Sequence, residues 1–167
     1  RLGATDVCPL PPLPAMTLED DVPYAYALGQ RIRLELGIPG YFYESAAKEA
    51  KRKNLANCRS GEYEGLAAKF QDSAWQPDFG DVSGDAWVKT GAIAVSARNF
   101  LVAYNIKLNT TSTRWANAIA FDIRERGSVK REGGSLTGEI VKDAQGNPVN
   151  VPGELPCVKG IGWFIEE

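Results

Sequence analysis

The residue types available for catalysis are restricted in this chain, because its 167 residues include no histidine. Within these residues, that absence excludes a Ser-His-Asp or Cys-His nucleophile, a histidine-ligated metal and the commonest general base near neutral pH. Acid–base chemistry is left to carboxylates, lysine, tyrosine or cysteine, or to a histidine from outside the chain. Cys8, Cys58 and Cys157 are widely spaced and form no C-x-x-C pair, so we expect three free thiols and no metal site.

Two charge clusters each have two interpretations. Glu62 and Glu64 flank Tyr63 and form either an acid–base pair or the acidic first turn of a helix, where they complement the helix dipole. A basic run either meets an anionic ligand or is the solvated face of a helix; it comprises Lys48, Lys51, Arg52 and Lys53.

The composition limits the partners and the location. A net charge of -2 gives no general attraction to phosphates, so we expect no nucleic-acid partner. Apolar stretches fall far short of the roughly 18 residues that span a bilayer, and no apolar leader follows a basic segment. We therefore expect a cytoplasmic protein with no membrane partner.

A long glycine-containing stretch, Trp75 to Gly91, is the clearest candidate for a functional loop. Loops longer than about 12–15 residues without secondary structure are usually functional or disordered. Because this one contains three large aromatic residues, we expect it to pack over something: Trp75, Phe79 and Trp87.

The clearest element that could support this loop is a helix over residues 17–37. Thr17 and Asp20 have the spacing of a capping box, apolar residues recur every three or four positions, and Gly37 stands at the C-terminal end. Pro23 predicts a kink or a distorted first turn. Before this helix, prolines restrict residues 6–10 to an edge strand or a strand exit.

Strands and helices alternate along the rest of the chain. The pattern predicts strands at 40–44, 93–95, 100–108 and 157–166, helices at 45–55 and 111–126, and a hairpin turning at 143–147. This alternation predicts an α/β (α+β) fold, a sheet with helices packed on a face.

Five strings in order along the chain resemble the glutamate formimidoyltransferase (formiminotransferase) family. They are RLGATDVCP at 1–9, GEYEGL at 61–66, WQPDFG at 75–80, ARNFLVAYNIKLN at 97–109 and GIGWF at 160–164. The resemblance covers essentially the whole chain. It implies two similar α/β subdomains, each a mixed sheet with outer helices, and a folate between them.

The resemblance also implies how the chain is organised. We expect an internal fragment of a longer protein, with residues 1–91 in the later part of the N-terminal subdomain. Residues 92–167 then form the earlier part of the C-terminal subdomain, with an inserted hairpin at about 128–156.

In the family the catalytic histidine lies in a His-Pro-Arg-x-Gly string, whose end matches Arg1-Leu2-Gly3. The resemblance thus places that histidine two residues before Arg1, and no catalytic residue in this chain. It places folate and substrate binding in the loop 80–91, at Gly80, Asp81, Trp87, Val88, Lys89, Thr90 and Gly91. Two further polar candidates for the cleft are Arg98 and Asn105. Trp87 either stacks on a ligand ring or packs the loop, and Arg98 and Asn105 either contact the cleft or have structural roles in the strand.

The implied reaction moves the formimidoyl group of N-formimidoyl-L-glutamate to tetrahydrofolate, the co-substrate, in histidine degradation, with no metal. Two other functions stay open: a hydrolase that passes the one-carbon unit to water, and a catalytically silent folate-binding or assembly module. We expect the full-length protein to be a homodimer, and these 167 residues alone to be inactive and poorly stable.

Overall fold

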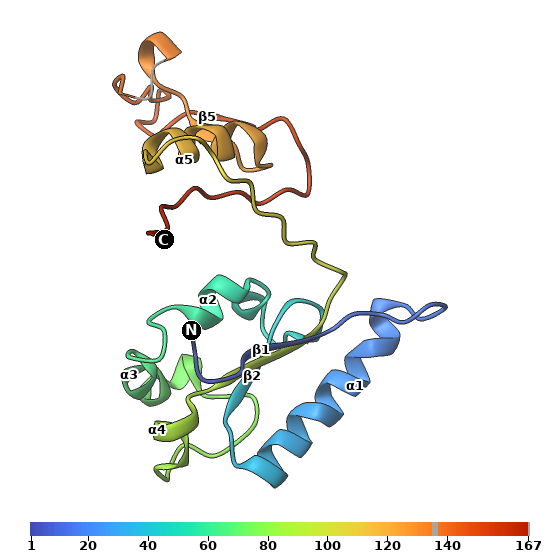
Figure 1. Cartoon of the computed structure of the whole chain (residues 1–167). Coiled ribbons are helices and arrows are strands. Elements are labelled where there is room, and N and C mark those ends of the chain that lie inside the picture. The colour runs from blue at the N-terminus through green and yellow to red at the C-terminus, as the bar shows by residue number, and fades with distance from the viewer. Residues whose placement is uncertain (135–136, 167) are drawn as a thin grey trace. The chain divides into compact units, whose positions relative to one another are not determined.

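The computed structural model describes residues 1–134 and 137–166. Two compact units divide the chain, Arg1–Val102 and Ala103–Glu167. The first contains a three-stranded sheet and most of the helices, and the second contains the α-helix α5 (Thr113–Ile123) and a two-stranded sheet (Figure 1). The mixed α/β class is confirmed. The sequence places the subdomain boundary earlier, between residues 91 and 92.

The sheet of the first unit is parallel, in the order β1-β3-β2. Its strands are β1 (Asp6–Leu10), β2 (Gly40–Phe42) and β3 (Ile93–Ala97). Asp6 and Gly40 both lie opposite Ile93. Among the described residues β1 is an edge strand, as its prolines predict, because Pro9 has no N–H to donate to a second neighbour.

The predicted helix 17–37 is confirmed as α1 (Leu18–Arg31) followed by a π-helical segment, Ile32–Leu36. Asp20 N–H donates to the Thr17 hydroxyl at 3.3 Å, and the Asp20 carboxylate accepts Thr17 N–H at 2.8 Å, which is the predicted capping box. The helix continues through Pro23 and ends at Gly37, whose φ of 66° is left-handed.

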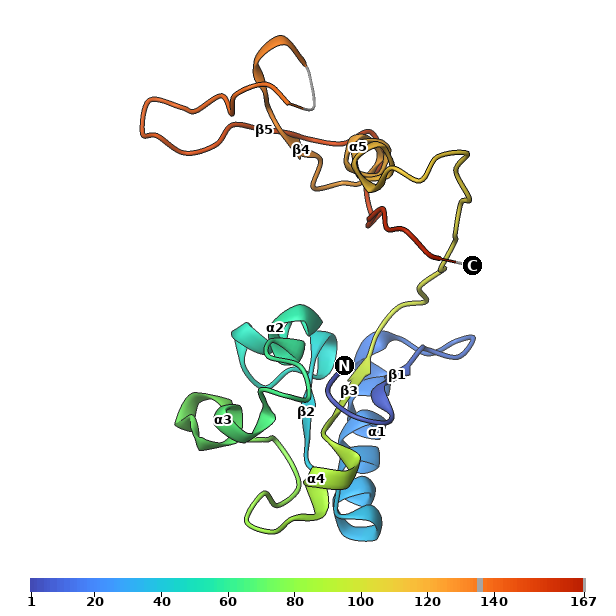
Figure 2. The ribbon, with the colours of Figure 1, turned by 60° about the vertical axis from the view of Figure 1, so that its left-hand side comes forward.

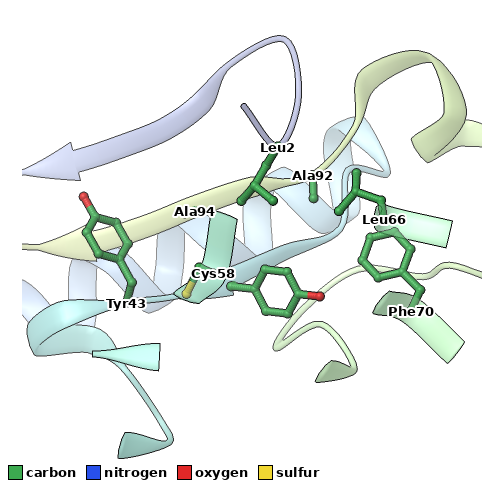
Figure 3. Close-up of a cluster of buried hydrophobic side chains, with 8 residues drawn as sticks. Leu2, Tyr43, Cys58, Leu66, Phe70, Ala92 and Ala94 are labelled. Carbon is green, nitrogen blue, oxygen red and sulfur yellow. The ribbon is translucent and has the colours of Figure 1, made fainter. Parts of the chain in front are cut away.

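Both faces of the sheet are buried, because successive side chains of β3 point to opposite sides. Ala94 belongs to one buried cluster, with Leu66 and Phe70 of α3 (Leu66–Gln71) (Figure 3). Ile93 and Val95 belong to the other cluster, which includes residues of α1. Figures 1 and 2 show α1 on one face and α2 (Leu55–Arg59) and α3 on the other.

The second unit has α5 (Thr113–Ile123) and an antiparallel pair, β4 (Ser128–Val129) with β5 (Asn150–Val151). The Ser112 hydroxyl caps α5 by accepting Trp115 N–H at 3.4 Å. Asp143 N–H donates to Asn147 carbonyl at 2.8 Å, so the predicted hairpin turn at 143–147 is confirmed.

Three predicted elements are wrong. Residues 100–108 and 157–166 form no strand, because a strand needs a neighbour for its backbone groups and no described segment forms a β-ladder with them. Residues 45–55 form two 3-10 turns, Glu44–Ala46 and Ala50–Arg52, in place of a helix. Here the Arg52 side chain turns into the core, and tertiary contacts override the local helical pattern.

Three further features bear on possible sites. Within residues 1–134 and 137–166, no helix is long and apolar enough to cross a membrane. The same residues bring together no group of three or more cysteine and carboxylate side chains that could hold a metal ion. All three cysteines are free, as their spacing predicts.

Candidate functional site

A pocket of about 280 Å³ lies where the start of the chain meets the end of the loop 80–91. Two of its lining residues, Arg1 and Lys89, are cationic, one carries a phenol, and none is acidic. The six residues are Arg1, Gly3, Ala4, Tyr63, Lys89 and Thr90. The side chains of Arg1 and Lys89 suit an anionic ligand, because carboxylates are the partners that arginine and lysine most readily bind. The Glu62 carboxylate lies 3.0 Å from the Arg1 backbone nitrogen but outside the lining.

Backbone hydrogen bonds hold the two walls of this pocket together. Ala4 N–H donates to Thr90 carbonyl at 3.0 Å, and Ala92 N–H donates to Leu2 carbonyl at 3.0 Å. Gly3 and Gly91 form an antiparallel bridge between these bonds. The N-terminal segment and the residues before β3 therefore form one rigid corner at the amino end of the sheet.

The second wall is a short helix, α4 (Ala86–Thr90), which lies inside the predicted loop. Trp87 packs edge-on against Phe70, with ring centroids 5.2 Å apart, and so fixes α4 on the core. The Tyr63 hydroxyl donates to Val88 carbonyl at 2.5 Å. These two contacts hold the exposed Lys89 at the edge of the pocket. The contact with Phe70 gives Trp87 a packing role, and its contact with a ligand stays a prediction.

The predicted loop residues fall into two groups in the structure. Residues 87–91 are held at the pocket, which Lys89 and Thr90 line. Gly80 and Asp81 lie at the other end of the loop: Gly80 packs against the backbone of Pro39. Asp81 accepts Ser83 N–H and the Ser83 hydroxyl, both at 2.8 Å, and these bonds lower the pKa of its carboxyl.

Arg98 is not brought to this pocket by the described contacts. Arg98 follows β3, whereas Gly91 precedes it, and five strand residues separate the two by about 16 Å. Arg98 forms an ion pair with Glu44 at 3.4 Å. Asn105 is exposed and belongs to the second unit, so its contact with a ligand stays a prediction.

Sequence reasoning missed four of the lining residues: Arg1, Gly3, Ala4 and Tyr63. The strings at 1–9 and 61–66 point to both segments, but a string does not tell which of its side chains face a ligand. Glu62 and Glu64 are exposed and do not line the pocket, so the structure brings no acid–base pair there. Lys51 and Arg52 of the basic run lie over the Trp75 ring. These two side chains therefore fit neither an anion-binding site nor the solvated face of a helix.

Asp6, just behind the pocket wall, has both of its carboxylate oxygens hydrogen-bonded. Burial by itself would raise the pKa of its carboxyl, but other contacts outweigh burial and lower it. These are the bond from Leu2 N–H at 2.9 Å and the Arg59 guanidinium at 2.6 Å. The carboxylate form is the one that the folded chain stabilises.

This lowered pKa predicts how stability depends on pH. A carboxyl whose pKa is lower in the folded chain stabilises it above the unfolded value, near 3.8, and loses that effect as the pH falls through the folded pKa. We expect Asp6→Asn to lower the free energy of unfolding by the same amount from pH 7 to about pH 5, and by less below about pH 4. Urea unfolding of both proteins across this pH range measures the difference in their free energies of unfolding. A difference that grows as the pH falls contradicts a lowered pKa for Asp6.

The fold and the pocket together define an α/β protein with a cation-lined pocket at the amino end of a parallel sheet. Comparison with known proteins shows the family. The family model described as the formiminotransferase domain, N-terminal subdomain, matches residues 1–98, and the one described as the formiminotransferase domain matches residues 103–167. The chain belongs to the formiminotransferase family, as its five strings predict.

Curated relatives match along all or most of the chain. Formimidoyltransferase-cyclodeaminase from Sus scrofa and that from Gallus gallus are each 40% identical over 168 residues, which cover 100% of this chain and 27% of the relative. Glutamate formimidoyltransferase from Streptococcus pyogenes is 41% identical over 127 residues, 76% of this chain and 42% of the relative. The chain thus spans about a quarter of the length of the first two relatives.

Proposed function

We propose that the protein transfers the formimidoyl group of N-formimidoyl-L-glutamate to tetrahydrofolate, giving 5-formimidoyltetrahydrofolate and L-glutamate, in histidine degradation. The observation that carries the proposal is family membership over both units, joined with a cation-lined pocket where the predicted catalytic string meets the predicted folate loop. We also propose a cytoplasmic homodimer with no metal and no nucleic-acid or membrane partner.

The pocket suits one end of either substrate. N-formimidoyl-L-glutamate carries two carboxylates, and so does the glutamate end of tetrahydrofolate. The pocket volume of about 280 Å³ is close to the lower limit of small-ligand sites, about 300 Å³. These residues therefore fit a glutamate moiety held by Lys89 and Arg1.

The transfer needs one proton to move between two nitrogens. The pterin amine attacks the formimidoyl carbon, a new carbon–nitrogen bond forms, and the bond from that carbon to the glutamate nitrogen breaks. A proton leaves the attacking amine and a proton reaches the departing one. A base with a pKa near neutrality serves both steps, and we propose the histidine two residues before Arg1 for this role. Lys89 and Arg1 then orient the glutamate moiety beside it.

The test uses the full-length protein that the gene encodes. Purified protein is mixed with N-formimidoyl-L-glutamate, with and without tetrahydrofolate, and released glutamate is measured. We expect glutamate only when tetrahydrofolate is present, in equal amount to the formimidoyl-folate formed. Release without tetrahydrofolate overturns the proposal in favour of a hydrolase. Folate binding with no release overturns it in favour of a silent binding or assembly module.

Lys89 gives a sharper prediction for the same assay. Lys89→Met keeps the aliphatic stem and removes the charge, so we expect KM for one of the two substrates to rise about five- to tenfold with little change in kcat. Which KM rises identifies the bound glutamate moiety. Lys53→Met, an exposed lysine outside the pocket lining, is the matched control and should leave both KM values unchanged. Equal KM values for Lys89→Met and the unmodified protein rule out a binding role for Lys89.

A further inference from the structure

Asp6 has a backbone conformation that is uncommon outside glycine. Its φ is 61°, in the left-handed region that favours glycine, although it is the first residue of β1. Such residues persist only where their surroundings hold them, and they cluster at functional sites. The side chain is 13% exposed and does not line the pocket.

Both carboxylate oxygens of Asp6 are engaged, each by a different element. Oδ1 accepts Leu2 N–H at 2.9 Å, and Oδ2 accepts the Arg59 guanidinium at 2.6 Å. Arg59 is the last residue of α2. The carboxylate therefore ties the N-terminal segment to α2 through charge-assisted hydrogen bonds, which are the stronger kind.

The segment held in this way is the pocket wall. Leu2 is fully buried, and its carbonyl accepts Ala92 N–H at 3.0 Å. Gly3 and Ala4, the next two residues, line the pocket. Asp6 thus holds the turn formed by residues 2–6 from one side, and the residues before β3 hold it from the other. The left-handed φ at Asp6 bends the chain back, so that the Asp6 side chain reaches Leu2 N–H.

We infer that Asp6 is a positioning residue for the transfer reaction. Its carboxylate fixes residues 1–5 against the end of α4, so that the chain entering at Arg1 delivers its reactive side chain to the pocket at a constant place. This inference rests on the proposed function, including the base two residues before Arg1. Asp6 acts through Leu2 and touches no substrate.

The left-handed backbone allows a test that separates positioning from stability. In the full-length protein, Asp6→Gly removes the carboxylate and relieves the unfavourable φ, so the two effects on Tm oppose each other. We expect Tm within a few degrees of the unmodified protein and kcat about ten- to a hundredfold lower, with KM changed less than about twofold. A purely structural role predicts that activity and Tm move together.

Two further variants complete the test. Arg59→Gln removes the other half of the ion pair and leaves the Asp6 backbone unchanged, so we expect a smaller fall in kcat in the same direction. Asp20→Asn is the matched control, because its carboxylate also accepts a backbone N–H, that of Thr17 at 2.8 Å, but on the exposed start of α1. It should leave kcat unchanged.

The outcomes distinguish the positioning role of Asp6 from the proposed transferase function on which it rests. Unmodified protein that releases no glutamate overturns the proposed function and this inference with it. Active protein whose Asp6→Gly and Arg59→Gln variants keep full kcat overturns only the positioning role. A fall in kcat that follows Tm in both variants also overturns it, as does a rise in KM at constant kcat.

Discussion

Replacing Arg52 with methionine is expected to lower the free energy of unfolding by about 3–5 kcal/mol, the usual result of removing one partner of a buried ion pair. Arg52 and Asp78 pair at 2.5 Å, and each side chain is only 4% exposed. Without Arg52, the Asp78 carboxylate stays buried without its countercharge. The substitution also removes the bond from Arg52 to Gln76 carbonyl at 2.9 Å.

A control and a second variant test whether the buried, uncompensated charge of Asp78 causes this loss of stability. Arg31→Met breaks an ion pair of 2.7 Å with Glu35, but these side chains are 71% and 56% exposed, so we expect a much smaller loss than for Arg52→Met. Combining Arg52→Met with Asp78→Asn removes the uncompensated charge, and the amide oxygen introduced by the second substitution still accepts Phe42 N–H, as the carboxylate does. The double variant should unfold at higher urea than Arg52→Met alone. A loss below about 1 kcal/mol for Arg52→Met shows that water screens this pair.

This pair also explains where prediction from sequence fails. The helix over 17–37 is predictable because its cap, its apolar period and its terminal glycine all lie within the segment. Arg52 is different: its partner Asp78 is 26 residues away, and nothing in the charge run 48–53 indicates it. The strand predicted at 100–108 fails for a related reason, since a strand is defined by its neighbour and periodicity describes only one chain segment.

The candidate site likewise has lining residues that the sequence predicts and lining residues that it does not. The sequence names two lining residues, Lys89 and Thr90, because they lie in the one loop that the resemblance to the family singles out. Tyr63 and Ala4 join them only through long-range contacts, the Tyr63 bond to Val88 carbonyl and the Ala4 bond to Thr90 carbonyl. A sequence shows which segments carry a site, whereas the backbone hydrogen bonds decide which side chains face it.

Gly91 joins these segments, and Gly91→Ala is expected to have a large effect on both stability and activity. Its φ of 69° and ψ of -152° lie in a region that is essentially restricted to glycine. A Cβ there would stand 2.2 Å from Leu2 carbonyl oxygen and 2.4 Å from Gly3 Cα. Because both are backbone atoms, the N-terminal segment must move. We expect a loss of about 3 kcal/mol or more in the free energy of unfolding.

The activity should fall further than the stability suggests, because the displaced segment is the pocket wall. A shift of about 1 Å in a positioning element can cost a hundredfold in rate, so we expect kcat to fall about that much even at a temperature where Gly91→Ala is fully folded. Gly84→Ala is the matched control in the same loop: no heavy atom lies within 4 Å of its Cβ position, and its φ is outside the left-handed region. It should change the free energy of unfolding by less than about 1 kcal/mol and leave kcat unchanged. If the two variants behave alike in urea unfolding and in the glutamate-release assay, the contact between Gly91 and the N-terminal segment does not hold the site together.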